Sequence, residues 1–283
     1  MGRKEKRRKS KQKKERARRK RMARSADKYA LYQRAVQVPE SDVRFLRRVF
    51  RQTFGRDPRS LREDFCGTAA LCCAWVEAHG SNFAFGVDLD PEPLAWGREH
   101  NVGALPEEAT KRVELIEGDV RSASHEPVDV TVGFNFSYFL FKTRPALLEY
   151  FRKARTTLHD EGLFVLDVFG GADAHKTMEE DTDHEDFVYT WDQDRYDPIS
   201  MEMLCHIHFG FPDGSRMKRA FTYDWRLWSI RELRELLEEA GFAKSDVYWE
   251  GTDTETWEGN GVFSKRERAP DDPAFIAYIV AQP

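Results

Sequence analysis

Apolar side chains first recur at helical spacing in the stretch that follows Pro39. Residues 41–54 repeat hydrophobic positions three and four apart, which predicts a helix with Ser41 as its N-cap. Aromatic and apolar residues begin to cluster slightly earlier, at residues 29–32. We therefore expect the folded part of the chain to begin near Asp27.

Short apolar runs then alternate with helical patterns as far as residue 169. We expect strands at residues 60–65, 83–87, 113–117, 128–134 and 163–169. We expect helices at residues 68–78, from Pro91 onward, and at residues 145–158. Strands that alternate with helices in this way are typical of a parallel sheet whose strands are joined by helical crossovers.

The hydrophobic period changes to two after Gly171. This change predicts an antiparallel β meander inserted at about residues 173–228. Its alternating runs lie at residues 187–191, 201–211 and 216–228.

A last helix and two short strands follow the meander. Ser229 and Glu232 have the spacing of a capping box, so a helix should start there and end at Gly241. Runs at residues 247–249 and 275–278 are expected to close the sheet as a hairpin with a long polar loop.

Charge is distributed unevenly along the chain. Residues 1–24 contain 15 Lys or Arg and 2 Glu, a net charge of +13, whereas the other 259 residues contain 30 basic and 47 acidic side chains, a net charge of −17. Because the basic segment has almost no apolar surface to bury, we expect residues 1–26 to form a disordered tail. Such a tail can bind nucleic acid through counterion release, or it can serve only solubility or localisation.

Composition argues against several other classes of protein. No stretch approaches the roughly 18 consecutive apolar residues of a membrane span, and no apolar signal core follows the basic N-terminus. The four cysteines show neither a disulfide framework nor a zinc-binding spacing. We therefore expect a reduced cytoplasmic protein, or a nuclear one in a eukaryote, without a metal ion.

Residues with candidate chemistry follow the first three predicted strands. The first strand runs into small residues around Gly67, where a ligand can approach the backbone at a helix N-terminus. Asp88 ends the second strand 21 residues later, a place from which a carboxylate can accept both ribose hydroxyls of a nucleoside. Asp119 follows the third strand. Only one of the three glycines of a dinucleotide turn is present, which disfavours a nicotinamide cofactor.

In these residues the chain resembles the class I S-adenosylmethionine-dependent methyltransferases. The resemblance spans roughly residues 58–170, and the closing hairpin extends it to the C-terminus. It implies a seven-stranded Rossmann-like α/β domain at residues 27–283 that carries the antiparallel β insertion. It also implies an enzyme that binds S-adenosylmethionine and transfers its methyl group.

The first-strand turn of that family has an acidic residue followed by alternating glycines. Aligning residues 66–68 with this turn puts Glu63 at the acidic position and Phe65 and Ala69 at the two outer glycines. The turn of this chain therefore departs from the family pattern, although Gly67 still permits a close approach.

The same resemblance assigns roles at the ends of the next strands. It implies that Asp88 binds the ribose, Asp119 the adenine amino group and Val120 the adenine face. The residues assigned to the cofactor are Glu63, Phe65, Gly67, Asp88, Leu89, Asp119, Val120 and Asn135.

The fourth strand runs into Asn135–Tyr138, where the family places the methyl group that is transferred. This segment resembles the Asn-Pro-Pro-Tyr signature of certain amino-group methyltransferases only faintly, because both prolines are missing. More similar are the small-molecule methyltransferases, including sugar N-methyltransferases. We therefore expect a small-molecule acceptor and a catalytic Tyr138, while the phenylalanines nearby can simply be core residues.

The predicted meander supplies candidate acceptor-binding residues. Alternation places His206 and His208 on one face of a strand, where a neutral imidazole can take up a proton. The alternative is a solvated strand surface, and a metal site lacks a third ligand there. The residues expected to contact the acceptor are Tyr29, Tyr32, Trp191, Tyr223 and Arg226.

Two other functions are consistent with the sequence. The protein can be a methyltransferase directed at RNA or the ribosome, with the basic tail as its electrostatic anchor. It can also be a non-catalytic RNA-binding protein on a methyltransferase fold, an interpretation that the altered glycine turn keeps open.

Overall fold

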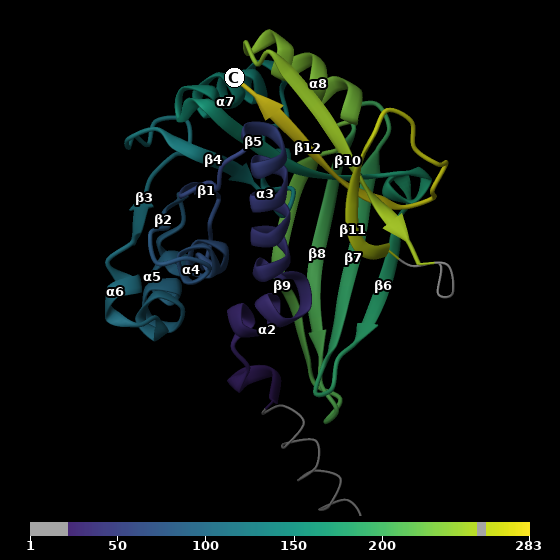
Figure 1. The fold of residues 1–283 in the computed structure, drawn as a ribbon. Helices are drawn as coiled ribbons and strands as arrows, with labels where there is room; N and C mark the ends of the chain where they lie inside the picture. The colour runs from purple at the N-terminus through teal and green to yellow at the C-terminus, as the bar shows by residue number, and fades with distance from the viewer. Residues whose placement is uncertain (1–21, 254–258) are drawn as a thin grey trace, which may run out of the picture. The chain divides into compact units, whose positions relative to one another are not determined.

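The chain folds around two separate sheets (Figure 1). The structure is a computed structural model that describes residues 22–253 and 259–283. Its main unit contains Val38–His175 and Arg226–Pro283, and its insertion unit contains the described residues up to Gln37 together with Lys176–Trp225. The predicted insertion at about residues 173–228 therefore corresponds to the second segment of the insertion unit.

The sheet of the main unit has the strand order β11-β10-β12-β5-β4-β1-β2-β3. Strands β1 to β5 run parallel, whereas β12, β10 and β11 each run antiparallel to their neighbours. The strands are β1 (Ser60–Asp64), β2 (Phe83–Asp88), β3 (Val113–Glu117), β4 (Val128–Gly133), β5 (Leu158–Gly170), β10 (Lys244–Thr252), β11 (Gly259–Arg266) and β12 (Phe275–Gln282). All seven predicted strands are present, and β11 adds an eighth at one edge of the sheet.

Helices cover both faces of this sheet. They are α3 (Pro39–Phe54), α4 (Ala70–Glu77), α5 (Pro91–His100), α6 (Glu107–Thr110), α7 (Arg144–Thr156) and α8 (Ile230–Glu239). Helix α3 packs against α4, whereas α7 packs against α8. The capping box of Ser229 and Glu232 starts α8 as predicted. The predicted cap of α3 is wrong: Pro39 occupies the first turn behind Val38, because proline's fixed φ suits a helix start, and Ser41 lies within the helix.

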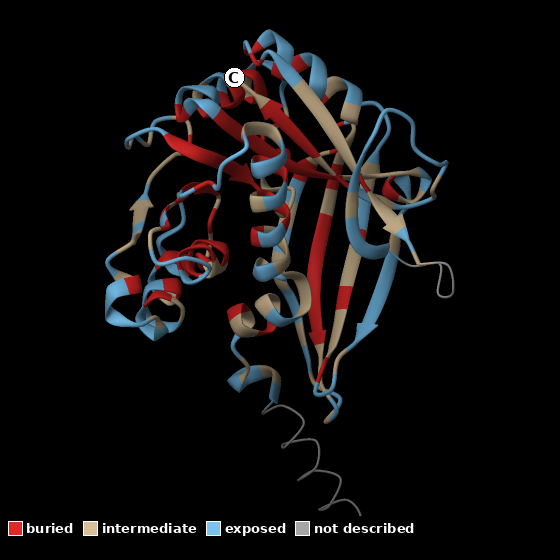
Figure 2. Cartoon of the chain, viewed as in Figure 1, coloured by how far each residue is buried: buried red, intermediate tan, exposed pale blue. Residues whose placement is uncertain are grey.

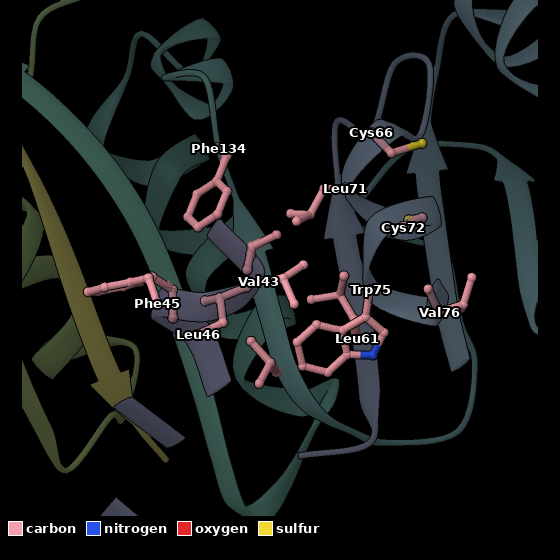
Figure 3. Close-up of a cluster of buried hydrophobic side chains, with 14 of the residues drawn as sticks. Val43, Phe45, Leu46, Leu61, Cys66, Leu71, Cys72, Trp75, Val76 and Phe134 are labelled. Carbon is pink, nitrogen blue, oxygen red and sulfur yellow. The ribbon is translucent and has the colours of Figure 1, made fainter. Parts of the chain in front are cut away.

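The apolar positions that predicted α3 and α4 build the main core. Val43 and Leu46 of α3 gather with Leu61 of β1 and with Leu71 and Trp75 of α4, as Figure 3 shows. On the opposite face of the sheet, aromatic side chains of α7 pack on β5, and every residue of β4 is buried. Figure 2 shows the burial along these strands.

The insertion unit contains a four-stranded antiparallel sheet and a short helix. The strands lie in chain order as β6 (Met178–Asp183), β7 (Val188–Asp197), β8 (Glu202–Gly210) and β9 (Arg216–Arg226), and the helix is α2 (Lys28–Val36). Leu31 of α2 packs on Ile207 and Phe209 of β8. Strand β6 was not predicted, because its largely acidic, exposed residues have no apolar alternation and only the backbone pairing with β7 defines it.

The folded part begins earlier than predicted. Residues 22–25 form a helical turn, and the amide of Ala23 donates a hydrogen bond to Ser215 Oγ at 3.1 Å. Residues 22–26 therefore do not belong to a disordered tail. The rest of the predicted tail, residues 1–21, lies outside the described residues.

Candidate functional site

Charged side chains occupy the central strand β1, all five residues of which are buried. Glu63 Oε2 accepts hydrogen bonds from the amide of Cys72 at 3.1 Å and from its thiol at 3.0 Å. Burial raises the pKa of Glu63 to about 8, and the nearby carboxylates of Asp42 and Asp88 add to this effect. Glu63 thus joins the end of β1 to the first turn of α4.

The turn between β1 and α4 has an unusual backbone. Phe65, Gly67 and Ala69 have φ angles of 58°, 52° and 59°, the left-handed region that glycine adopts most easily. Phe65 and Ala69 occupy the two positions at which the family that the chain resembles has glycine. Both residues therefore adopt the backbone conformation of glycine although neither is glycine. The ring of Phe65 packs edge-on against Tyr150, with 5.5 Å between the ring centroids.

Helix α5 holds the other side of this turn. A Cβ atom on Gly97 would collide with the carbonyl group of Thr68, so only glycine lets α5 approach this closely. Asn101 Nδ2 donates a hydrogen bond to the same carbonyl at 2.8 Å. In contrast, a Cβ atom on Gly67 would meet nothing within 4 Å, so this glycine borders open space.

Asp88 lies at the end of β2, directly beside the turn. Its Oδ2 accepts a hydrogen bond from the amide of Gly67 at 2.7 Å, and its Oδ1 accepts one from the amide of Asp90 at 2.9 Å. Burial raises the pKa of Asp88. The next residue, Leu89, has 69% of its surface exposed, which is unusual for a leucine between a buried strand and a helix.

Asp119 follows β3 and is paired within its own loop. Its carboxylate accepts hydrogen bonds from Arg121 Nε at 3.0 Å and Nη2 at 2.6 Å, and this pairing lowers the pKa of Asp119. Val120 beside it is buried, with 4% of its surface exposed. A ligand that takes the Asp119 oxygens would therefore share them with Arg121.

Asn135 and Phe136 follow β4 with φ angles of 56° and 55°. Their amides donate hydrogen bonds to the carboxylate oxygens of Asp167 on β5, at 2.7 and 3.0 Å, which holds this strained turn. Burial raises the pKa of Asp167 to about 8. The hydroxyl of the fully buried Tyr138 donates to the Asp167 carbonyl at 2.6 Å. Its proton is thus already engaged, so the predicted catalytic role of Tyr138 has no support in this geometry.

The residues assigned to the cofactor gather at one edge of the main sheet. Asp64 lies level with Val87 of β2 and with Gly133 of β4, so the carboxyl ends of these parallel strands coincide. In open α/β sheets, ligands bind outside this edge, next to the point where the strand order reverses. That point lies between β1 and β4 in this sheet.

The two candidate histidines lie on β8 of the insertion unit, and both are buried rather than solvated. His208 accepts a hydrogen bond from the amide of Arg219 at Nδ1 and donates from Nε2 to Asp192 Oδ2 at 3.0 Å. His206 contacts Thr222 Oγ1 through Nδ1 at 2.9 Å, whereas its Nε2 has no hydrogen-bond partner and lies 3.6 Å from Asp194. The alternative of a solvated strand face is therefore wrong.

The aromatic residues predicted to contact an acceptor also lie in the insertion unit. Tyr29 and Tyr32 of α2 pack against Phe221, and Trp191 packs against Tyr223. Arg226 belongs to the main unit, where it donates to the carbonyl of Lys142 and to Glu232. Their proposed contact with an acceptor stays a prediction.

Sequence reasoning missed Asp42, Arg62, Arg121 and Asp167. Asp42 accepts a hydrogen bond from Tyr278 at 2.7 Å, and burial raises its pKa to about 6. The sequence does carry one signal for such residues, a charged residue within an apolar run. Asp167 in the fifth predicted strand is an example.

Among the described residues, no group of three or more His, Cys, Asp or Glu side chains can hold a metal ion. No described helix is long and apolar enough to cross a membrane.

Solved structures resemble nearly the whole chain, although no protein-family model and no curated protein matches it. A methyltransferase dependent on S-adenosylmethionine, from Clostridium acetobutylicum, is 16% identical with a TM-score of 0.62, covering 90% of this chain and 97% of its own. The sugar N-methyltransferase KedS8 from a Streptoalloteichus species is 17% identical with a TM-score of 0.61, covering 90% and 92%. The amino pentose methyltransferase CalS10 from Micromonospora echinaspora, with S-adenosylmethionine bound, is 14% identical with a TM-score of 0.63, covering 90% and 96%.

These identities are low, so the likeness establishes the architecture. The chain has the fold of the S-adenosylmethionine-dependent methyltransferases, as its sequence predicted. Fold alone does not fix function, which must be argued from the site.

Proposed function

We propose that this protein is a methyltransferase that binds S-adenosylmethionine at the carboxyl edge of its main sheet. The proposal is carried by Asp88, whose carboxylate lies at the end of β2 and accepts the amide of Gly67. A carboxylate at this place can also accept the two hydroxyls of a ribose, because each of its oxygens has a second lone pair.

The neighbouring residues fit the rest of this cofactor. The exposed Leu89 offers an apolar surface to an adenine ring, and the open space at Gly67 admits a ligand close to the backbone. Asp42, Glu63 and Asp167 have carboxyl groups whose pKa values are raised by burial at the same end of the main unit. A ligand that carries sulfonium and ammonium charges would favour the ionised form of these groups and lower their pKa values.

The cofactor supplies an activated methyl group, because its sulfonium is a good leaving group. The protein's part is then to hold the acceptor in line with that methyl group and to exclude water. Asp167 fixes the turn of Asn135 and Phe136. In the family that the chain resembles, this turn lies beside the methyl group that is transferred. These residues therefore act by positioning rather than by covalent catalysis.

Isothermal titration of the full chain with S-adenosylhomocysteine tests the proposal. The Asp88→Ala variant should bind about 10- to 100-fold more weakly than the wild type, because it loses charge-assisted hydrogen bonds worth roughly 1.5 to 3 kcal/mol. The matched control is Asp90→Asn, two residues away, because asparagine can cap α5 as Asp90 does now. Equal affinity of wild type and Asp88→Ala would remove Asp88 from the site and with it the basis of the proposal.

For the acceptor we propose a small molecule with an amino group. The solved neighbours include a sugar N-methyltransferase and an amino pentose methyltransferase, which supports this class. A screen with labelled cofactor against amino sugars, other small amines and RNA tests it. Labelling of RNA alone would contradict the proposal and favour the alternative that the basic tail suggests.

A further inference from the structure

Arg62 is a fully buried arginine on the central strand β1. Strands in the middle of a parallel sheet usually carry apolar side chains, so a charge at this position is unexpected. Its Nε donates a hydrogen bond to Asp64 Oδ1 at 2.6 Å, and Tyr150 donates to the other oxygen of Asp64 at 3.1 Å. The charge is thus compensated within the sheet.

The other end of the guanidinium reaches the connection between β3 and β4. Its Nη2 donates to the carbonyl of Val120 at 2.7 Å, and its Nη1 donates to the carbonyl of Ala123 at 3.2 Å. Nη1 also lies 2.9 Å from Nε2 of His125. Because Nδ1 of His125 faces the carbonyl of Glu126 and must donate to it, Nε2 is left to accept from Arg62.

The strand order explains why these contacts are possible. Strand β3 lies at the edge of the sheet and β4 lies beyond β1, so the chain between them must cross β2 and β1. This crossing contains no helix. Few backbone hydrogen bonds hold this crossing. Two of them are donated by the amides of Ser122 and Ala123 to the carbonyl of Asp119, at 2.9 and 2.8 Å. Arg62 is therefore a major anchor of the crossing to the sheet beneath it.

We propose that Arg62 is a positioning residue for the adenine end of the cofactor site. By holding the carbonyl of Val120, it fixes the backbone next to Asp119, the residue assigned to the adenine amino group. This inference rests on the proposed function, because it presumes that an adenosyl cofactor binds there. It predicts that Arg62 sets the preference for adenine without touching the ligand.

The experiment compares the affinities of the full chain for S-adenosylhomocysteine and S-inosylhomocysteine, which has a carbonyl in place of the adenine amino group. The test variant is Arg62→Lys, which keeps the charge but cannot reach several acceptors at once. We expect its preference for the adenosyl ligand to fall about tenfold, the value of one hydrogen bond to a well-placed carboxylate. Amide hydrogen exchange at residues 119–125 should also become faster in the free variant.

The matched control is Arg56→Lys. Arg56 Nη2 donates to Asp129 Oδ1 at 2.8 Å near the start of β4, away from the carboxyl edge. This variant should lose some stability but keep the ligand preference and the exchange rates of residues 119–125. A double variant, Arg62→Leu with Asp64→Leu, removes both buried charges together and should lose the preference as Arg62→Lys does.

The outcomes separate this inference from the proposed function. If the wild type binds neither ligand, the proposed function fails and the inference fails with it. If the wild type prefers the adenosyl ligand and folded Arg62→Lys prefers it equally, only the inference is overturned. Failure of Arg62→Lys to fold would also overturn it, since Arg62 would then be a general stabilising residue.

Discussion

Glu63 shows how a single buried carboxyl group can couple folding to pH. Its hydrogen bonds come from Cys72, and burial raises its pKa from 4.5 to about 8. Between these values the folded protein keeps a proton that the unfolded chain has lost. The folded state therefore binds more protons than the unfolded state, and the free energy of unfolding falls as the pH rises through this range.

We predict that Glu63→Gln weakens this pH dependence. The amide cannot ionise, so the decrease in unfolding free energy between about pH 5 and 8 should lessen by up to about 1.4 kcal/mol per pH unit. Urea denaturation at several pH values measures the slope, and the control is Glu77→Gln, an exposed position on α4, the helix that contains Cys72. Parallel curves for wild type and Glu63→Gln would show that Glu63 ionises normally in the folded protein.

At the scale of elements, strand β8 contains two histidines in different situations. Both nitrogens of His208 have hydrogen-bond partners within the sheet, whereas Nε2 of His206 makes no hydrogen bond and lies 3.6 Å from Asp194 Oδ2. A buried imidazole nitrogen that makes no hydrogen bond is the better candidate for a general base, whereas an imidazole with both nitrogens hydrogen-bonded is the better candidate for a structural role.

We therefore predict that the two alanine variants differ. His208→Ala should lower the free energy of unfolding by roughly 1 to 3 kcal/mol, because it leaves buried partners without a hydrogen bond. His206→Ala should lower turnover of the acceptor about 100-fold or more, with unchanged affinity for S-adenosylhomocysteine. Denaturation and steady-state kinetics measure the two effects, and unaltered turnover in His206→Ala would confine β8 to a structural role.

The elements themselves were largely predictable from the sequence, because short apolar runs mark strands, apolar positions three and four apart mark helices, and a capping box marks a helix start. Strand β4, helix α3 and the capping box of α8 are examples. Strand β11 and the acidic β6 escaped prediction, since pairing with a neighbour rather than burial creates them.

The candidate site was only partly predictable. The place of Asp88 in the site could be predicted, because the sequence marks the ends of the strands. The hydrogen-bond partners of Arg62 and Asp167 could not be predicted, because a hydrogen bond between distant segments leaves no pattern along the chain. The left-handed backbone of Phe65 and Ala69 was hidden for a similar reason, since the fold imposes it against the preference of these residues.

At the scale of the whole molecule, the basic N-terminal segment distinguishes the possible acceptors. A shortened chain that lacks residues 1–21 keeps the helical turn that contacts Ser215. We predict that it transfers methyl groups to a small-molecule acceptor as fast as the full chain does. Rate measurements from low to high salt provide the test. A large loss of activity, together with loss of a steep salt dependence, would favour an RNA acceptor.

The division of the chain into units has a consequence for its synthesis. The insertion unit combines residues up to Gln37 with Lys176–Trp225, and the main unit combines Val38–His175 with Arg226–Pro283. Helix α2 therefore leaves the ribosome long before the strands that cover its apolar side, and β5 appears well before its partner β12. Contacts between such distant segments close large loops and slow folding. The nascent chain must keep Leu31 and its neighbours from aggregating until at least residue 225 has emerged, so this protein is expected to depend on chaperones during translation.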